Sequence, residues 1–112
     1  MAFMSSEKGS TAWKHQRLTA VILMLSLLFF TSAFFVHNQA SYPEIIAWLR
    51  HPGIAALFIT TLGALFYHSF LGIKMIIEDY VHLKQLRQVV LFVSFIFHLF
   101  FAILGVILLI LI

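Results

Sequence analysis

The chain has no cysteine and little charge. Without thiolates it can neither ligate an iron–sulfur cluster through cysteine nor form a disulfide. Charged residues make up 10% of its 112 residues, whereas a soluble domain carries about 25%. Hydrophobic residues make up 62%, so the composition excludes an ordinary soluble domain. Soluble catalytic chemistry would have to come from other chains, and we assign no catalytic residue to this one.

Three apolar runs dominate the sequence, at residues 18–36, 54–77 and 89–112. Each is long enough to cross a hydrocarbon core of about 30 Å, which takes roughly 20 helical residues. None shows the strict alternation that a membrane β-barrel requires. The first run is longer than the apolar core of a signal peptide, so we expect it to be retained. The sequence therefore predicts an all-α membrane protein, a single domain over residues 1–112 with three transmembrane helices.

Basic residues lie beside the predicted spans, which favours a role in topology over nucleic-acid binding. Three precede the first span and two lie between the second and third: Lys8, Lys14, Arg17, Lys84 and Arg87. The other connection carries only Arg50 among lysines and arginines. We therefore expect a cytoplasmic amino terminus and a carboxyl terminus on the far side. Lys74, near the inner end of the second span, can reach the headgroups, and we assign it no chemistry.

Two segments lie outside the apolar runs. Residues 1–11 have little to bury, so we expect them to be mobile or to lie over a partner. In the connection at residues 37–53, Pro43 can start a short helix. Its apolar residues would lie along the membrane surface: Ile45, Ile46, Trp48 and Leu49. Pro52 and Gly53 then end this helix and start the second span.

His68 lies deep in the second apolar run, where an imidazole is costly unless something binds it. Its neighbours on the same helical face are small: Thr61, Ala64 and Gly72. Small side chains let a flat macrocycle or a neighbouring helix approach the backbone closely. Histidine is a common axial ligand of b-type haem. The alternative is that His68 hydrogen-bonds a serine or a carbonyl group and binds nothing.

His98 competes with His68 for such a role. It lies eleven residues after Arg87, much as His68 lies eleven before Asp79, so both reach similar depth in a helical hairpin. The two histidines could sandwich one haem and make the chain a self-contained small b-type cytochrome. Alternatively, His98 packs between helices or bonds an interhelical hydroxyl group. A third interpretation is a structural membrane adapter without a cofactor.

Asp79 and Tyr80 follow at the end of the second run. Asp79 lies about 20° around the helix from His68 and roughly 16 Å along its axis. A tyrosine hydroxyl can donate to a quinone carbonyl, and a nearby carboxylate can relay protons. Arg17, with Thr19, starts the first helix, where a guanidinium suits a haem propionate or a quinone headgroup. The alternatives are an ordinary helix end, an interfacial aromatic residue and a topology marker.

Two motifs carry a resemblance to a known family. They are WKHQRLTA at residues 13–20 and HSFLGIKMIIEDYV at residues 68–81, in which Gly72 follows the histidine by four residues and Asp79-Tyr80 by eleven and twelve. With three spans in a chain of this length, the sequence resembles the small hydrophobic membrane-anchor subunit (the D subunit) of succinate dehydrogenase, respiratory complex II. The resemblance covers essentially the whole chain.

The resemblance implies a role for each candidate residue. His68 matches the axial ligand of the haem b iron, with the other ligand coming from a partner anchor subunit, so that His98 becomes a packing residue. Tyr80 matches the tyrosine that hydrogen-bonds ubiquinone, and Asp79 matches the acid beside it. Arg17 matches the arginine near the haem propionates and the quinone.

The resemblance also implies partners and a location. The partners are a second membrane-anchor (cytochrome b) subunit, an iron–sulfur subunit and a flavoprotein that oxidises succinate. The chain would be a multi-pass protein of the bacterial inner (cytoplasmic) membrane, in contact with lipid and not catalytic alone. It would serve the tricarboxylic acid cycle and electron transport. Family members differ in haem content, in the use of ubiquinone or menaquinone, and in whether they oxidise succinate or reduce fumarate.

Overall fold

The computed structural model of the protein describes residues 9–112. It contains helices α2 (Gly9–Val36), α3 (Tyr42–Arg50), α4 (Pro52–Tyr80) and α5 (Lys84–Leu111), and no strand in this part of the chain. Helices α2, α4 and α5 are long and apolar enough to cross a membrane. The prediction of an all-α protein with three spanning helices is confirmed.

Of residues 1–11, which we expected to be mobile or to lie over a partner, the structure describes only the last three. Residues 1–8, with Lys8, lie outside the described residues. Residues 9–11 begin α2, so this part of the segment is helical. That it lies over a partner stays a prediction. The three long helices thus extend beyond the apolar runs at their polar ends.

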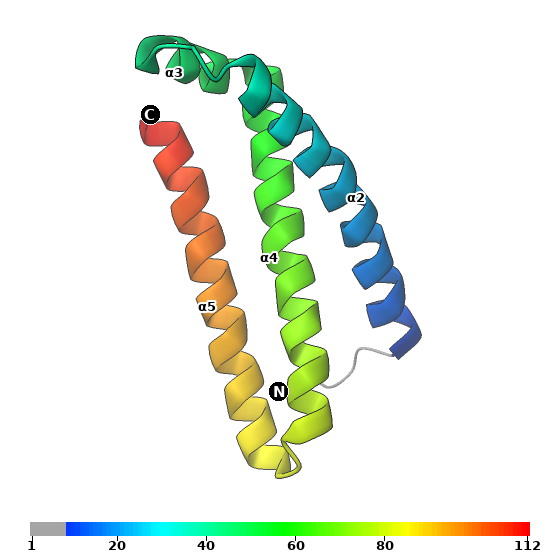
Figure 1. Ribbon diagram of the computed structural model, residues 1–112. Helices are drawn as coiled ribbons and strands as arrows, with labels where there is room; N and C mark the ends of the chain where they lie inside the picture. The colour runs from blue at the N-terminus through cyan, green and yellow to red at the C-terminus, as the bar shows by residue number, and fades with distance from the viewer. Residues whose placement is uncertain (1–8) are drawn as a thin grey trace.

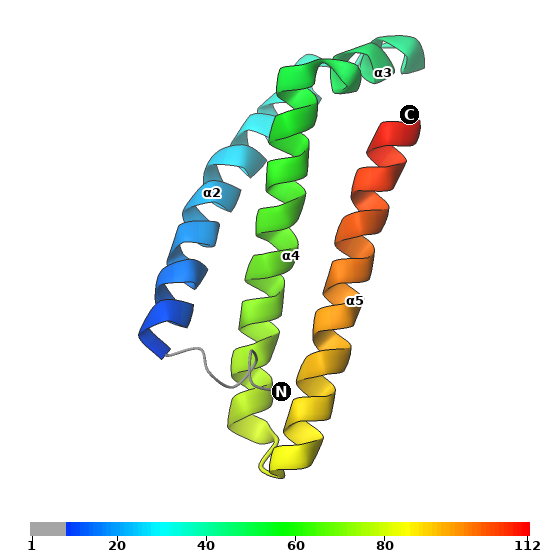
Figure 2. The ribbon, with the colours of Figure 1, turned by 180° about the vertical axis from the view of Figure 1, so that it is seen from behind.

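Helix α4 lies in the middle of the molecule, with α2 and α5 on either side of it in both views (Figures 1 and 2). Helix α3 lies across the end where α2 finishes and α4 starts (Figure 1). The start of α2 and the turn between α4 and α5 lie at the opposite end. The guanidinium of Arg50, the last residue of α3, donates a hydrogen bond to the carbonyl oxygen of Ile112.

Helix α3 forms where the sequence places its starting signals. The Glu44 carboxylate accepts hydrogen bonds from the Ser41 backbone N–H (2.7 Å) and from the Ser41 hydroxyl (2.8 Å). The first of these bonds satisfies the Ser41 backbone N–H, which has no intrahelical partner at a helix start. Pro43 lies in the first turn, where a missing N–H costs nothing. The short helix expected after Pro43 is confirmed.

An aromatic cluster fixes α3 to the long helices. The Trp48 ring contacts Phe30 of α2, with ring centroids 6.2 Å apart, and His37, with centroids 4.9 Å apart. Phe30 in turn contacts Phe58 of α4 at 5.7 Å. The apolar side chains of α3 are half-buried: Ile45, Ile46, Trp48 and Leu49. This helix therefore packs partly on the protein itself and not only on a membrane surface.

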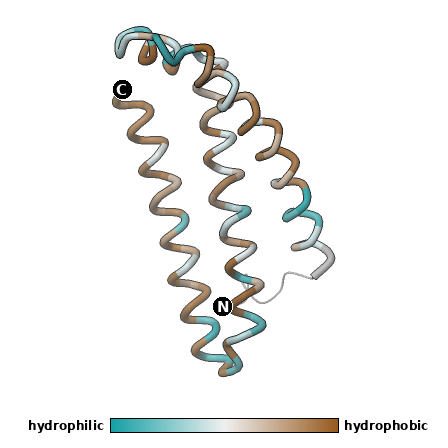
Figure 3. Tube along the Cα trace, viewed as in Figure 1, coloured by the Kyte–Doolittle hydropathy of each residue, from teal (hydrophilic) through white to brown (hydrophobic). Residues whose placement is uncertain are grey.

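Apolar side chains are largely exposed along the spanning helices. The long helices are mostly hydrophobic, with isolated hydrophilic positions near the middle of α4 and α5, and further hydrophilic residues gather at α3 and at the turn between α4 and α5 (Figure 3). Phe34 and Phe97 are 69% and 58% exposed, whereas few side chains, such as Leu71 and Leu91, are buried. A soluble monomer rarely exposes so much contiguous apolar surface. With three candidate spans, this makes the chain a multi-pass membrane protein.

Candidate functional site between helices α2 and α4

His68 faces helix α2. Its Nδ1 atom lies 2.9 Å from the hydroxyl oxygen of Thr19, a buried residue of α2. The Thr19 hydroxyl itself donates to the carbonyl oxygens of His15 (2.8 Å) and Gln16 (3.1 Å) within α2. A hydroxyl group has one hydrogen to donate, so its oxygen accepts from His68 Nδ1–H. We therefore assign His68 the tautomer with its proton on Nδ1 and a free lone pair on Nε2.

The Nε2 atom of His68 has no hydrogen-bond partner within residues 9–112. Metal-bound histidines commonly donate their other ring N–H to a protein oxygen, which fixes both the tautomer and the ring orientation. The contact between Thr19 and His68 has the same pattern. It leaves Nε2 of His68 as the ring nitrogen that is available to a further partner.

The small residues beside His68 let α2 approach α4. A Cβ atom placed on Gly72 would lie 3.7 Å from the side-chain amide nitrogen of Gln16, an ordinary contact distance. Thr61 and Ala64 are buried, and the Thr61 hydroxyl bonds its own helix at Leu57. Helix α2 therefore uses at least part of the space that these small residues leave.

The side-chain oxygen of the same Gln16 is buried without a hydrogen-bond partner in the described structure.

His98 has a different environment, on the opposite side of α4. It is buried, its Nδ1–H donates to the Ser94 carbonyl oxygen (2.7 Å), and its Nε2 accepts from the Ser69 hydroxyl of α4 (3.1 Å). The rings of Phe66 and Phe70 contact it edge-on. Both ring nitrogens are thus used in protein hydrogen bonds, which is the interhelical packing role that we weighed for this residue.

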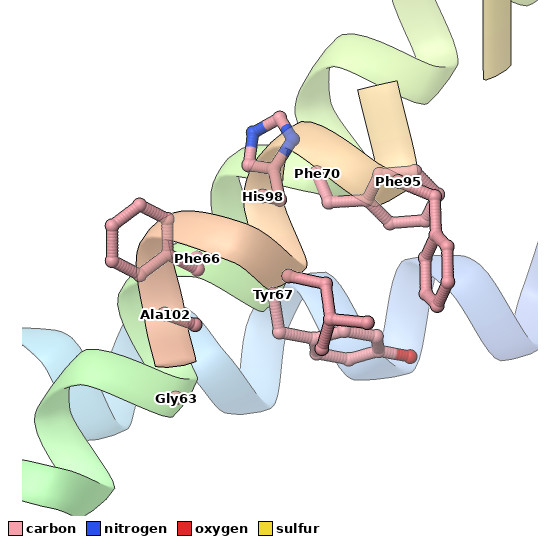
Figure 4. Close-up of a pocket in the computed structure, with 8 residues that line it drawn as sticks. Gly63, Phe66, Tyr67, Phe70, Phe95, His98 and Ala102 are labelled. Atoms are coloured by element: carbon pink, nitrogen blue, oxygen red, sulfur yellow. The ribbon is translucent and has the colours of Figure 1, made fainter. Parts of the chain in front are cut away.

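A cavity of about 240 Å³ follows the seam between α4 and α5. Figure 4 shows its lining, which is apolar apart from His98 and the hydroxyl of Tyr67. The eight residues that line it are Gly63, Phe66, Tyr67, Phe70, Phe95, His98, Leu99 and Ala102. The Tyr67 ring extends away from His98 towards α2, where its hydroxyl lies 2.6 Å from His15 Nδ1.

Asp79 and Tyr80 lie exposed at the end of α4, and Tyr80 is 77% exposed. Neither side chain forms a hydrogen bond or an ion pair within the described residues. Arg17 belongs to the same end of the molecule, but its guanidinium lies over the Trp13 ring, 5.3 Å from the centroid. The structure therefore does not bring Arg17 into contact with Asp79 or Tyr80.

Lys74 differs from its expected behaviour. A lysine that reaches the headgroups would expose its ammonium group, whereas Lys74 is 4% exposed. Its ammonium lies 3.8 Å from the Glu78 carboxylate, one turn further along α4. A buried cation of this kind is retained only with partners, because its desolvation is costly.

The polar partners of the histidines were not predicted. Thr19 was noted only beside Arg17, and the contacts of His15, Tyr67 and Ser69 were missed. A signal was present, because hydroxyl and imidazole groups within membrane spans commonly bond across helices. The spacing alone does not show which partner each group meets.

The protein is thus a three-span helical membrane protein with a hydrogen-bonded histidine between two of its spans. The chain matches the model of the succinate dehydrogenase/fumarate reductase transmembrane subunit family over residues 2–109. It belongs to this family.

Individual relatives agree with the family match. A succinate dehydrogenase hydrophobic membrane anchor subunit of Rickettsia bellii (strain RML369-C) is 40% identical over 89 residues, which cover 75% of this chain and 67% of the relative. The protein of the same name from Rickettsia prowazekii (strain Madrid E) is 34% identical over 89 residues, covering 79% and 70%. The one from Coxiella burnetii (strain RSA 493 / Nine Mile phase I) is 28% identical over 87 residues, covering 78% and 76%. The resemblance carried by the two motifs is thus confirmed.

Proposed function

We propose that this chain is the membrane-anchor subunit of a succinate:quinone oxidoreductase, where it helps to hold haem b and binds ubiquinone. The observation that carries the proposal is the hydrogen bond from His68 Nδ1–H to Thr19, which leaves Nε2 free to bind a metal. The names of the relatives support the anchoring role and succinate as the reductant.

The donor set fits a haem better than a metal held by protein alone. Within residues 9–112, no three histidine or acidic side chains group so as to hold a metal ion. His68 offers one nitrogen, so it would hold the haem iron together with the porphyrin and a residue of a partner subunit. When bound, haem b supplies one-electron exchange at a potential that depends on its axial ligands. His68 would hold the iron through Nε2, and Thr19 would orient the imidazole ring.

The exposed end of α4 supplies groups that suit a quinone. Reduction of a quinone to a quinol takes two electrons and two protons, and the electrons would come from succinate through the iron–sulfur subunit. Tyr80 would donate a hydrogen bond to one quinone carbonyl, and Asp79 would pass protons from water to the reduced oxygen. Arg17 would contribute positive charge near the same headgroup or a haem propionate. The exposure of Tyr80 and Asp79 supports this role, because both are accessible to a second molecule.

The remaining parts of the complex would be other chains. The absence of cysteine means that thiolate-bound iron–sulfur clusters must belong to a partner. We propose a second anchor subunit beside the exposed apolar faces, with an iron–sulfur subunit and a flavoprotein on the cytoplasmic side. The location would be the bacterial inner membrane, with the amino terminus in the cytoplasm.

The haem role is tested by the reduced-minus-oxidised spectrum of the purified complex, with His68→Ala compared with His98→Leu. We expect His68→Ala to lose the haem b bands, because the iron loses its axial nitrogen. His98→Leu is the matched control within the same hairpin. It should keep the bands but lower stability by about 1–3 kcal/mol, because the Ser69 hydroxyl loses its buried acceptor.

Two results would contradict the proposal. Loss of haem from both variants, with haem bound by the chain expressed alone, would indicate a self-contained cytochrome. Unchanged haem content and activity in His68→Ala would indicate a structural adapter.

A further inference from the structure

The contact between His15 and Tyr67 has no part in the function proposed above. The Tyr67 hydroxyl lies 2.6 Å from His15 Nδ1, and the two rings are tilted by 49° with centroids 5.8 Å apart. His15 is half-buried and Tyr67 is 39% exposed, so the contact lies at the edge of the interface between α2 and α4. A tyrosine hydroxyl in a spanning helix needs a hydrogen-bond partner, and an imidazole nitrogen supplies one.

This contact lies directly beside the one that holds His68. Tyr67 and His68 are consecutive on α4, and His15 and Thr19 are one turn apart on α2. The Thr19 hydroxyl also donates to the His15 carbonyl oxygen, at 2.8 Å. The four residues therefore form one closed circuit, in which two hydrogen bonds cross between the helices and one joins their partners within α2.

Two crossing bonds constrain α4 in a way that one does not. Consecutive residues point about 100° apart around a helix. A single contact at His68 would let α4 rotate about that contact, whereas a second contact at Tyr67 opposes the rotation. A single interhelical hydrogen bond in a membrane changes the ratio of bonded to unbonded helix arrangements by only about threefold. The Thr19 contact alone would therefore leave a sizeable fraction of His68 rings in other orientations.

We infer that His15 and Tyr67 are a positioning pair for His68. They hold α4 against α2 so that His68 Nδ1–H stays on Thr19 and Nε2 keeps one direction. The inference deepens the proposed function, since it rests on His68 being the axial ligand. Both residues would act through helix α4, which carries His68, and neither would bind the haem itself.

The test uses the complete complex in lipid nanodiscs, labelled with ¹⁵N-histidine and reduced with dithionite. In the unmodified protein, the His68 ¹⁵N resonances should show one species with a protonated, hydrogen-bonded Nδ1. In Tyr67→Phe, which removes only the hydroxyl, the fraction of His68 in other species should rise about threefold. In the oxidised complex, the electron paramagnetic resonance signal of the haem should also be broader in Tyr67→Phe than in the unmodified protein. Tyr42→Phe, the same change at an exposed position on α3, should leave both spectra unchanged.

A second pair of variants separates positioning from a general loss of packing. His15→Gln keeps an acceptor for the phenol and should restore a single His68 species, whereas His15→Leu should reproduce Tyr67→Phe. Unchanged His68 resonances in both Tyr67→Phe and His15→Leu would overturn the inference. If the unmodified complex holds no haem, the proposed function fails, but the His68 resonances still decide whether the pair positions the ring.

Discussion

Two histidines at similar depth in one hairpin differ in chemistry because their ring nitrogens meet different partners. His98 has both nitrogens in hydrogen bonds to Ser94 and Ser69. His68 has one bond, to Thr19, and a free Nε2. The difference comes from the 100° step between Ser69 and His68 on α4, which places one residue towards α5 and the other towards α2.

At the same scale, we expect Tyr80→Phe to weaken quinone binding. Loss of one hydrogen bond, worth about 0.5–1.5 kcal/mol, should raise the KM for quinone by roughly twofold to tenfold. Succinate oxidation with an artificial acceptor should be unchanged, because under the proposed function that reaction belongs to a partner subunit. The measurement is the ratio of the two activities in purified complex.

Tyr42→Phe is the control for this measurement, since it removes an exposed phenol at the other end of the molecule. An equal fall of both activities in Tyr80→Phe would argue for a structural role of this residue and against quinone binding.

At the scale of elements, α4 is the helix that organises the molecule. It presents Tyr67 and His68 to α2, and Ser69 and Phe70 to α5, within four consecutive residues. The outer helices need only one packed face each, and their other faces remain apolar and exposed. Helix α3 differs from the three long helices, because its start depends on a local capping interaction and not on the thickness of a membrane.

This capping interaction should make the start of α3 sensitive to acid. The Ser41 backbone N–H and then the Ser41 hydroxyl stabilise the Glu44 carboxylate, so the pKa of Glu44 lies below its ordinary value of 4.5. A lowered pKa means that the stabilisation is complete above the ordinary value and is lost as the pH falls through the lowered one. Amide exchange in residues 41–46, corrected for intrinsic rates, should therefore accelerate below pH 4.5.

Glu44→Gln is the matched control, because an amide can still accept from Ser41 but does not titrate. Exchange in this variant should not change with pH, and the unmodified protein should approach it in acid. The same acid-dependent acceleration in both proteins would show that another group is responsible.

At the scale of the whole molecule, the helices separate the polar residues into two ends. One end holds the start of α2 and the turn between α4 and α5, with Lys14, Arg17, Lys84 and Arg87. The other holds α3, with Arg50. Because lysine and arginine are enriched in cytoplasmic segments, we propose that the first end faces the cytoplasm.

This orientation predicts the labelling of single cysteines, for which a chain without natural cysteine is well suited. In spheroplasts, a membrane-impermeant maleimide should label the Asn38→Cys variant at once. It should label the Gln85→Cys variant only after permeabilisation. Both positions are exposed in the structure. The unsubstituted chain should not react, and the reverse pattern would invert the proposed topology.

Much of the fold could be predicted because its signals are local. Runs of about twenty apolar residues without strict alternation form helices in a bilayer, since a helix satisfies its backbone polar groups within one segment. Pro43 and Pro52 mark helix starts for a reason equally local to each position. The intramembrane His68 was likewise visible as an unusual residue in an apolar run.

The contacts of the site could not be predicted from such local signals. Periodicity shows that Thr61, Ala64 and Gly72 share a face with His68, but not whether a helix or a macrocycle fills the space beside them. It also does not show that Lys74 would be buried. These properties depend on how far each helix is rotated and shifted against its neighbour. That arrangement depends on contacts between residues far apart in the sequence, such as Thr19 and His68.

The three spans, the short connecting helix and the two intramembrane histidines can all be read from the amino-acid sequence. The spans follow from the cost of exposing backbone polar groups to hydrocarbon, and the short helix follows from Pro43 and its local cap. Which histidine keeps a free nitrogen depends on the packing of the helices. The pairing of Thr19 with His68 and of Ser69 with His98 exists only when the faces of α2, α4 and α5 meet in one register.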